Sequence, residues 1–542
     1  MKLILKKFSI IYILLKGLKV NNMKRKVFKI YRKAMVINSL YLYVSTFVQI
    51  YIATIVGGFF NEAIAGNTST IIKSGVTFLG IIAVVTIVQW LLSNYTKLLN
   101  EKSSMELRKY IFNKFLLSSF QNIEKFSSGE IINRFKKDIH TISDLFKDSY
   151  VVVFTGVLSL GTYFIVLANL NVTIALIILA IGLIPIISPI IFQRIFSKIF
   201  YDMREIEEMT SETLMDAIKG IEHIKINNLY DFFKEKYHYC MKSYLKQGLK
   251  AEGTIAIQDG LEQGFDKISY IMIYIVFAYY IFKGYINVGQ VVTGIFLSRQ
   301  IINSMMDVLN QYINIVKSKI SFKRIENILM PEIVIGIEDI NAIDKIEISN
   351  LIFSYNEERK ILNNIFLTIN KGEKIAILGG NGKGKSTLIK ILLKLYEEYE
   401  GDITIDGKNL KNISATSYRN RLCWCPQHTT FFFDKVEENL DLLGNIQKEE
   451  VIKLLNKFNL PNNITEKKWQ ELSGGQKQKL SLIRSLTKDG DVVILDEPSN
   501  YLDKDGIEEL KNILMQDKRT VVLITHNEDL LEIANRKYVM GT

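Results

Sequence analysis

The chain has 542 residues, of which 48% are hydrophobic and 23% charged, and its formal net charge is +12. This length predicts two large domains rather than one. The hydrophobic residues lie mostly before about residue 315, in long runs of the kind that cross a bilayer. Lysine and arginine flank these runs or spread along the C-terminal half without forming a compact basic patch. This distribution argues against nucleic-acid binding.

The first 33 residues come before the first long apolar run. Met1–Asn22 has a basic start but no small-residue cleavage site, which argues against a cleaved signal peptide, and Met23 is an alternative start. The basic stretch Lys24–Lys33 predicts a helix that lies on the cytoplasmic membrane surface. We therefore interpret residues 1–33 as a cytoplasmic, interfacial segment.

Six windows are apolar enough to cross a membrane, which takes about 20 residues. The fifth window is short, and Arg299 interrupts the sixth. The windows are Ala34–Phe59, Gly75–Tyr95, Tyr150–Leu170, Val172–Phe192, Ile268–Phe282 with its flanks, and Val291–Val308. They predict a six-helix transmembrane domain over residues 34–325.

The distribution of lysine and arginine predicts the orientation of these spans. Both residues are dense before the first span and in the long connections 97–149 and 194–267, which places these segments in the cytoplasm. The two connections have apolar residues at helical spacing and no proline, so we expect long cytoplasmic helices. Pro185 and Pro189 lie inside the fourth span and predict a bend there.

Several polar side chains lie inside the predicted spans. They are Tyr41, Tyr43, Gln49, Tyr51, Tyr270, Tyr274, Arg299, Gln300 and Asn303. Polar groups in spans usually face the bundle interior, so these side chains would line a cavity for an amphiphilic cargo. Interfacial tyrosines, and polar groups that bond to neighbouring helices, are an equally good explanation for each residue.

A proline and several acidic residues near Ile328–Asp344 indicate a linker, which we place at residues 326–343. From residue 344 to residue 542 the pattern changes to short strands and amphipathic helices, which predicts an α/β domain. In this domain a strand-like run, Lys374–Leu378, leads through GGNGKGKS into the helix-like Thr387–Leu395. This is a phosphate-binding loop in its required strand–loop–helix context.

The phosphate-binding loop predicts an ATP site. Its backbone N–H groups and the following helix N-terminus would bind phosphate oxygens. Lys385 would reach the β- and γ-phosphates, and the Ser386 hydroxyl would ligate Mg²⁺. The predicted nucleotide-binding residues here are Gly379, Gly380, Asn381, Gly382, Lys383, Gly384, Lys385, Ser386 and Thr387.

A second apolar strand, Val492–Leu495, ends in two carboxylates. A buried strand that delivers a carboxylate beside the phosphate loop is the second metal-binding element of P-loop ATPases. Asp496 would hold Mg²⁺, and Glu497 would polarise the attacking water as general base.

The segment Leu472–Gln476, with the sequence LSGGQ, precedes an amphipathic helix and can present N–H groups to an anion. Together with the two motifs above, it resembles the signature motif of the ATP-binding-cassette (ABC) superfamily. The resemblance covers the chain from about Asp344 to its end. In that superfamily the signature of one subunit closes over ATP held by the phosphate loop of another, so the resemblance implies a head-to-tail dimer.

The resemblance also implies roles for single residues. Tyr355 would stack on adenine, Asp503 would lie in a dimer-contact loop, and His526 would contact the γ-phosphate. Gln427 would touch Mg²⁺, the attacking water and the transmembrane domain. The implied sites are catalytic Glu497, His526 and Gln427, metal-binding Ser386, Gln427 and Asp496, and nucleotide-binding Tyr355, Ser473, Gly474, Gly475, Gln476 and Asp503.

The membrane half is similar to the exporter branch of the same superfamily, particularly at Phe126–Arg134 in the first long connection. This similarity implies short coupling helices near Gln121–Lys125 and Asn227–Phe232. One departure from the pattern is that the chain stops soon after His526, so we expect the usual C-terminal strand and helix to be missing.

The sequence therefore predicts an exporter-type transmembrane domain fused to a P-loop ATPase, an ATP- and Mg²⁺-dependent enzyme coupled to transport. We expect a multi-pass protein of the cytoplasmic membrane that exports a peptide or a hydrophobic drug-like compound. Its partner would be a second half-transporter, with a homodimer favoured and a heterodimer as the alternative. A lipid flippase and a membrane-anchored ATPase that gates or signals are the rival functions.

Overall fold

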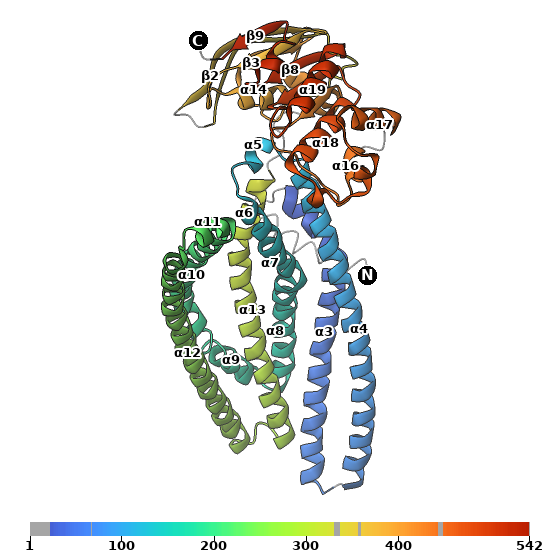
Figure 1. The fold of residues 1–542 in the computed structure, drawn as a ribbon. Coiled ribbons are helices and arrows are strands. Elements are labelled where there is room, and N and C mark those ends of the chain that lie inside the picture. Colours follow the sequence, from blue (N-terminus) through green and yellow to red (C-terminus); the bar gives the residue numbers. More distant parts are fainter. Residues whose placement is uncertain (1–21, 67, 330–335, 356–358, 443–447, 541–542) are drawn as a thin grey trace. The chain divides into compact units, whose positions relative to one another are not determined.

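The computed structural model describes residues 22–66, 68–329, 336–355, 359–442 and 448–540 (Figure 1). The choice between Met1 and Met23 as the start therefore concerns a segment outside the described residues. The chain divides into two compact units. The helical unit comprises Met1–Phe112 and Gly129–Glu326, and the α/β unit comprises Asn113–Ser128 and Asn327–Thr542.

Long and short helices make up the helical unit. They are α3 (Asn22–Ile64), α4 (Thr68–Leu116), α6 (Ser128–Asn133), α7 (Ile139–Asp144), α8 (Tyr150–Leu170), α9 (Val172–Ile181), α10 (Ile187–Lys219), α11 (Ile221–Ile226), α12 (Tyr230–Phe282) and α13 (Val288–Ile328). The predicted third span coincides with α8. The predicted fourth span is interrupted between α9 and α10 at residues 182–186, which contain Pro185, so the predicted bend is confirmed.

Four helical stretches of the described chain are long and apolar enough to cross a membrane, by length and composition. They are Met23–Ile64, Ile71–Leu116, Ser128–Leu170 and Tyr230–Phe282, and Val172–Ile181 is a shorter apolar helix. The predicted sixth span lies in α13, where Arg299, Asp307 and several amides lower the hydropathy. The predicted count of six spans is therefore not confirmed on these grounds.

The basic stretch Lys24–Lys33 does not form the separate interfacial helix expected from the sequence. It is the first part of α3, because Val27 and Tyr31 point into the helical unit and are fully buried. The Tyr31 hydroxyl lies 2.8 Å from the Ser143 hydroxyl, and its ring stacks on Phe146 with 5.6 Å between centroids. Burial of these aromatic groups explains why the helix continues without a break.

The two long connections are helical, as predicted. One short helix, α5 (Phe120–Ile123), overlaps the expected coupling helix near Gln121–Lys125 and belongs to the α/β unit. The second short helix is α11, which ends at Ile226, whereas the expected range was Asn227–Phe232. The chain turns at Asn228, whose φ is +53°, and α12 begins at Tyr230, so the expected range contains this turn and the start of α12 rather than a separate short helix.

Two sheets form the α/β unit. The antiparallel sheet has the order β2-β1-β4-β5, with β1 (Lys345–Ser354), β2 (Lys360–Asn370), β4 (Glu400–Ile405) and β5 (Lys408–Asn409). The parallel sheet has the order β6-β7-β8-β3-β9, with β3 (Lys374–Leu378), β6 (Leu422–Cys425), β7 (Val492–Asp496), β8 (Thr520–Ile524) and β9 (Arg536–Val539). Because β9 follows His526 and pairs with β3, the expectation of a missing C-terminal strand is wrong.

Helices cover both faces of the parallel sheet. They include α14 (Lys385–Leu392), α15 (Ala415–Asn420), α16 (Val436–Leu440), α17 (Lys448–Lys457), α18 (Gly474–Leu486), α19 (Lys504–Gln516) and α20 (Glu528–Leu531). Alternate residues of β7 enter two different cores: Ile494 packs in the core that contains α14, and Val493 and Leu495 pack in the core that contains α18 and α19. This double burial explains why β7 is apolar throughout.

Candidate functional site: a nucleotide pocket at the ends of two buried strands

The phosphate-binding loop leaves the end of β3 and enters α14. Gly379, Gly382 and Gly384 have positive φ angles of 154°, 78° and 90°. A side chain on Gly384 would also collide with Leu362, because a Cβ there would lie 2.6 Å from Leu362 Cδ2. The Lys385 ammonium donates hydrogen bonds to the carbonyl oxygens of Gly379 (2.5 Å) and Gly380 (3.3 Å). The loop is thus shaped by glycine and closed by its own lysine.

The carboxylates at the end of β7 lie beside this loop, because β3 and β7 are parallel strands of one sheet. Glu497 has a left-handed backbone with φ of +50°, and its N–H donates to Ile524 O at 2.8 Å. Its carboxylate lies 3.6 Å from His526 Nε2, and the same nitrogen lies 3.5 Å from Lys385 Nζ. Such a backbone is unfavourable for a residue with a side chain and often marks a functional site.

Asp496 is 8% exposed. Its burial, and then the nearby charge of Glu497, raise its pKa, whereas a hydrogen bond with Ser386 acts in the opposite direction. Burial disfavours the ionised form of Asp496, and a bound divalent cation would stabilise that form. The carboxylate and the neighbouring Ser386 hydroxyl are also oxygen ligands of the kind that Mg²⁺ prefers. No group of three or more His, Cys, Asp or Glu side chains with metal-binding geometry occurs in the described part of the chain. Asp496 and Ser386 therefore suit Mg²⁺, which usually takes one or two protein ligands together with phosphate oxygens.

Tyr355 follows β1 and forms the other wall of the site. Its hydroxyl lies 3.1 Å from Thr387 Oγ1 and 3.5 Å from the hydroxyl oxygen of Tyr396. Tyr396 is fully buried and stacks on Phe353 with 5.1 Å between ring centroids and an interplanar angle of 18°. The Tyr355 ring is half exposed, so one ring face remains available to a planar ligand.

Tyr396 also connects the site to α5, and the sequence did not indicate this contact. Its hydroxyl donates to Glu124, which also accepts from Lys390 Nζ at 2.8 Å. The Lys390 ammonium lies 5.6 Å from the centroid of the Phe120 ring. Burial alone would raise the pKa of Glu124, but the hydrogen bonds from Lys390 and Tyr396 outweigh it and lower this pKa. An ionised Glu124 thus binds α5 to the end of α14.

These groups enclose a pocket of about 350 Å³, within the size range of small-ligand sites. The residues that line it are Tyr355, Ile361, Gly380, Asn381, Gly382, Lys383, Gly384, Lys385, Ser386, Thr387, Gln427, Asp496, Glu497 and Ile524. Most of the predicted site residues are therefore brought together. Ile361 and Ile524 were not predicted, because nothing in the sequence distinguishes them from other strand residues.

The predicted signature residues Ser473, Gly474, Gly475 and Gln476 do not line this pocket. They begin α18, where Ser473 and Gln476 form a reciprocal capping box. A Cβ on Gly475 would lie 2.8 Å from Tyr501 O, so close packing against Tyr501 requires glycine. Tyr501 itself is 71% exposed. The signature is thus a rigid, accessible helix start that is separate from the pocket of its own chain.

Asp503 also lies outside the pocket lining. Its carboxylate caps α19 by accepting from Gly506 N at 3.1 Å, and it pairs with Lys479 Nζ at 3.0 Å. The hydrogen bond from Lys479 is the main cause of a lowered pKa at Asp503. These bonds fix the loop that leads from β7 into α19.

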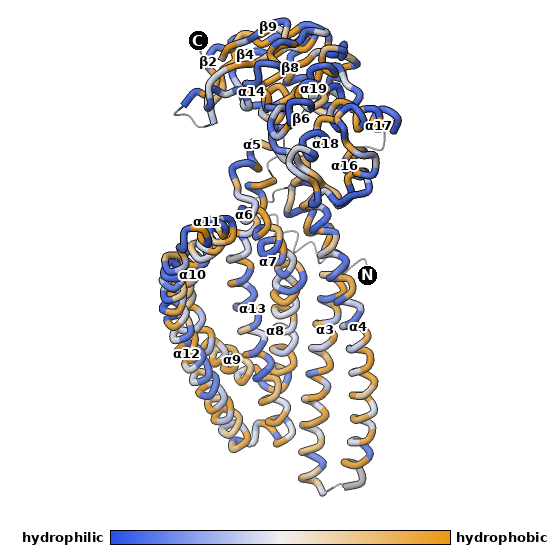
Figure 2. Tube along the Cα trace, viewed as in Figure 1, coloured by the Kyte–Doolittle hydropathy of each residue, from blue (hydrophilic) through white to orange (hydrophobic). Residues whose placement is uncertain are grey.

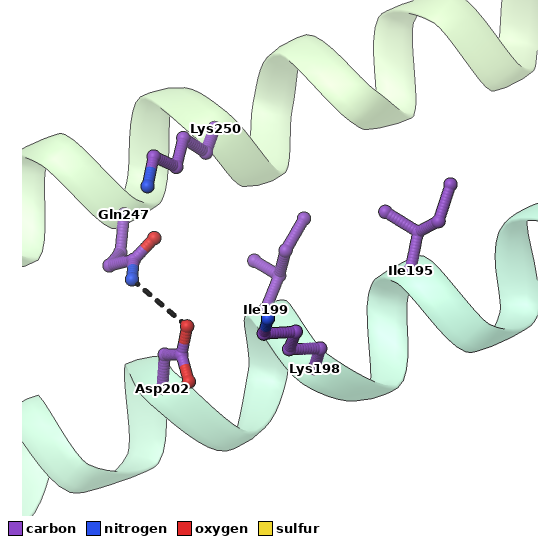
Figure 3. Close-up of a pocket in the computed structure, with 6 residues that line it drawn as sticks. All are labelled: Ile195, Lys198, Ile199, Asp202, Gln247 and Lys250. Atoms are coloured by element: carbon purple, nitrogen blue, oxygen red, sulfur yellow. Dashed lines mark hydrogen bonds between the residues drawn. The ribbon is translucent and has the colours of Figure 1, made fainter.

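A second pocket, of about 400 Å³, lies between α10 and α12 in the helical unit (Figure 3). Its lining residues are Ile195, Lys198, Ile199, Asp202, Gln247 and Lys250. Gln247 donates to Asp202 at 3.1 Å, and both lysines are exposed. The pocket contains none of the residues that the sequence predicted for the nucleotide site.

Family models match both halves of the chain. The model described as the ABC transporter transmembrane region matches residues 35–305, and the model described as ABC transporter matches residues 362–500. The second match includes the phosphate loop, the signature and both carboxylates. Tyr355, Asp503 and His526 lie outside the matched residues.

Similar proteins share much of the chain. The lactococcin-G-processing and transport ATP-binding protein LagD of Lactococcus lactis subsp. lactis is 27% identical over 88% of this chain and 70% of its own length. The lactococcin-A transport/processing ATP-binding protein LcnC of the same organism is 29% identical over 76% of this chain and 60% of its own length. The chain therefore spans roughly two thirds of the length of these relatives.

A solved structure has the same fold. The structure of a bacterial Atm1-family ABC exporter with ATP bound matches with a TM-score of 0.76 at 17% identity, and covers 92% of this chain and 93% of the other. Because family models match both halves of this single polypeptide, the chain belongs to the ABC transporters, with a transmembrane region and an ATPase domain in one chain and the fold of an Atm1-family exporter.

Proposed function

We propose that two copies of this chain use ATP to export a peptide or another amphiphilic compound across the cytoplasmic membrane. One observation carries the proposal: the phosphate loop and two carboxylates line one pocket, while the signature at the start of α18 lies outside it. A nucleotide in the pocket therefore needs a signature from elsewhere, and a second copy of the chain supplies it.

In this proposal the phosphate loop and Lys385 bind the ATP phosphates, and Tyr355 stacks on adenine. Mg²⁺, held by Ser386, Asp496 and Gln427, supplies neutralising charge at the phosphates. Glu497 takes a proton from the attacking water. His526, at 3.6 Å from the Glu497 carboxylate, is close enough to orient it and to meet the γ-phosphate.

Closure of the dimer completes each site with Ser473, Gly474, Gly475 and Gln476 of the other copy, and Asp503 lies in the loop that faces it. ATP favours the closed state because it contacts both copies only there. Every motif is intact in this chain, which supports a homodimer with two competent sites. The positive-inside pattern supports an N-terminus and an ATPase domain in the cytoplasm.

Export of a peptide rests on the relatives, two of which have names that describe transport and processing of lactococcins. Exporter-type architecture and long cytoplasmic helices support outward transport rather than uptake.

The test is Glu497→Gln in reconstituted vesicles, with Glu508→Gln, an exposed residue of α19, as the matched control. We expect ATP binding to persist and hydrolysis to fall by roughly 10²–10⁴-fold, the loss typical of a missing general base. The control should keep its activity. Unchanged hydrolysis in Glu497→Gln would reject the assignment of the base. ATP-dependent accumulation of peptide in inside-out vesicles would support export, whereas hydrolysis without any accumulation would favour the regulatory ATPase.

A further inference from the structure

The pocket between α10 and α12 joins two kinds of surface. Ile195 and Ile199 of α10 form its apolar part, and Lys198 and Lys250 come to it from the two facing helices (Figure 3). The aliphatic stems of the lysines extend the apolar part, and their ammonium groups add positive charge. A cavity with this lining suits a ligand that has an apolar tail and an anionic head.

The charged groups of the pocket are unbalanced. Lys198, Lys250 and Asp202 together leave a net charge of +1. The Asp202 carboxylate accepts from Gln247 at 3.1 Å and forms no ion pair with either lysine among the described residues. Neither ammonium group has another ion-pair partner in the part of the chain that the structure describes. Both lysines can therefore bind a group of one negative charge, such as a phosphodiester.

The register of α10 against α12 brings the two lysines to one level. The Ser188 hydroxyl donates to the Gln258 carbonyl oxygen at 3.4 Å, and the hydrogen bond to Asp202 lies further along both helices. The two helices thus run in opposite directions. Lys198 comes four residues before Asp202, and Lys250 comes three residues after the partner of Asp202. The lysines therefore face the same ligand from opposite sides.

This level is close to the cytoplasmic surface of the membrane in the predicted orientation. The apolar run of the predicted fourth span ends at Phe192, and Lys198 lies about 9 Å further along α10. The headgroup layer adds roughly 5–8 Å to the hydrocarbon on each side, and a lysine side chain can extend back into it. Figure 2 shows α9 as hydrophobic, whereas α10 is largely hydrophilic toward α11. The pocket thus lies where a lipid headgroup would be.

We propose that this pocket binds the phosphodiester headgroup of an anionic phospholipid from the cytoplasmic leaflet. Lys198 and Lys250 contact the phosphate oxygens, and Ile195, which is nearest to the predicted span, contacts the start of the acyl chains. Asp202 lies at the other end and repels the phosphate, which confines it to the level of the lysines. Basic pockets between membrane helices on the cytoplasmic side bind lipid headgroups in this way. The lipid is a ligand distinct from the exported cargo, and its binding needs neither ATP nor transport.

The test measures the affinity of the full-length protein, in a nonionic detergent, for the first bound lipid by native mass spectrometry. Phosphatidylglycerol and phosphatidylcholine with the same acyl chains separate an anionic headgroup from a zwitterionic one. Glycerophosphoglycerol, the anionic headgroup without acyl chains, is the competitor that separates a lipid from a soluble phosphate. The variants are Lys198→Gln, Lys250→Gln and both together. Lys246→Gln is the matched control, because Lys246 is exposed one helical turn from Lys250 but does not line the pocket.

We expect phosphatidylglycerol to bind at least about tenfold more tightly than phosphatidylcholine, as two lysines that attract one anionic lipid imply. Each single lysine variant should weaken binding of phosphatidylglycerol about fivefold, and the double variant roughly 25-fold. Asp202→Asn should strengthen it roughly two- to fivefold, because a repelling charge is removed, and a misfolded variant would not gain affinity. The Lys246→Gln control should change it by less than about twofold.

Four results would overturn the inference. Equal affinity for the two lipids would remove the role of charge, and an equal loss in Lys246→Gln would show a general attraction to the basic surface. Competition by glycerophosphoglycerol at the concentration of the lipid would assign the pocket to a soluble phosphate. Disulfide cross-linking between two Ile195→Cys chains, with the three buried native cysteines replaced by alanine, would show that a second copy fills the pocket. A chain that binds the lipid as expected but exports no peptide would refute the proposed function and leave the lipid site intact.

Discussion

Glu124→Gln should loosen α5 from the α/β unit. The carboxylate of Glu124 accepts hydrogen bonds from Lys390 and Tyr396, and hydrogen bonds to charged groups contribute about 1.5–3 kcal/mol each. Its side chain is 41% exposed, so solvent screens part of this energy, and glutamine can keep a weaker bond. We expect a net loss of about 1–2 kcal/mol, which makes opening of α5 roughly 5–30-fold more frequent.

Hydrogen exchange of the segment 119–128 measures this opening directly. The amides of Asn122, Ile123 and Glu124 donate within this segment, so they exchange when it opens. Glu398→Gln, an exposed position two residues after Tyr396, is the control and should leave exchange unchanged. Exchange that rises less than twofold in Glu124→Gln, or rises equally in the control, would refute the reasoning.

The same contact should depend on pH in a defined direction. Because the pKa of Glu124 is lowered from 4.5 in the folded protein, its contribution is complete above about pH 4.5. It is then lost as the pH falls through the lower, folded-state pKa. The protection of the segment 119–128, measured as the intrinsic exchange rate at each pH divided by the observed rate, should therefore fall in acid, and Glu124→Gln should remove that fall.

Two further predictions concern the nucleotide site. Gly475→Ala should lower both ATP hydrolysis and thermal stability, because its Cβ would meet Tyr501 O at 2.8 Å and displace the start of α18. Gly474→Ala, whose nearest atom would lie at 3.4 Å, should keep more of both. Equal activity and equal melting temperatures in the two variants would contradict this. Lys385→Ala should weaken ATP binding itself, and a titration with a fluorescent ATP analogue that shows unchanged affinity would remove Lys385 from the site.

The sequence located most of the residues that line the pocket, because they lie in local motifs. A phosphate loop of fixed spacing follows β3, a carboxylate pair follows β7, and parallel strands carry both to one edge of a sheet. Tyr396 and Glu124 could not be predicted in this way, because they are separated by 272 residues and no motif marks either of them. Their contact depends on how α5 packs against α14, which is a tertiary property.

The helical unit shows where hydropathy fails as a guide. The spans in α3, α4 and α8 are apolar on most sides, and the sequence located them. In α13 the packing face is apolar but the open face contains Arg299, Asp307 and amides, so the average hydropathy of the helix is low. A helix that buries only one face against protein needs to be apolar on that face and not all round.

The α/β unit contains two helix N-termini that suit an anion, and it uses them differently. The start of α14 lies in the pocket with Lys385, whereas the start of α18 is capped by Ser473 and lies outside it. A single chain thus presents one complete phosphate cradle and one unused signature. In the proposed dimer a signature adds binding energy only when a second chain brings it to the nucleotide, so ATP binding and closure of that dimer would stabilise each other to the same extent. If closure of this dimer is linked to movement of the membrane helices, the free energy of ATP binding also shifts the equilibrium between the arrangements of those helices.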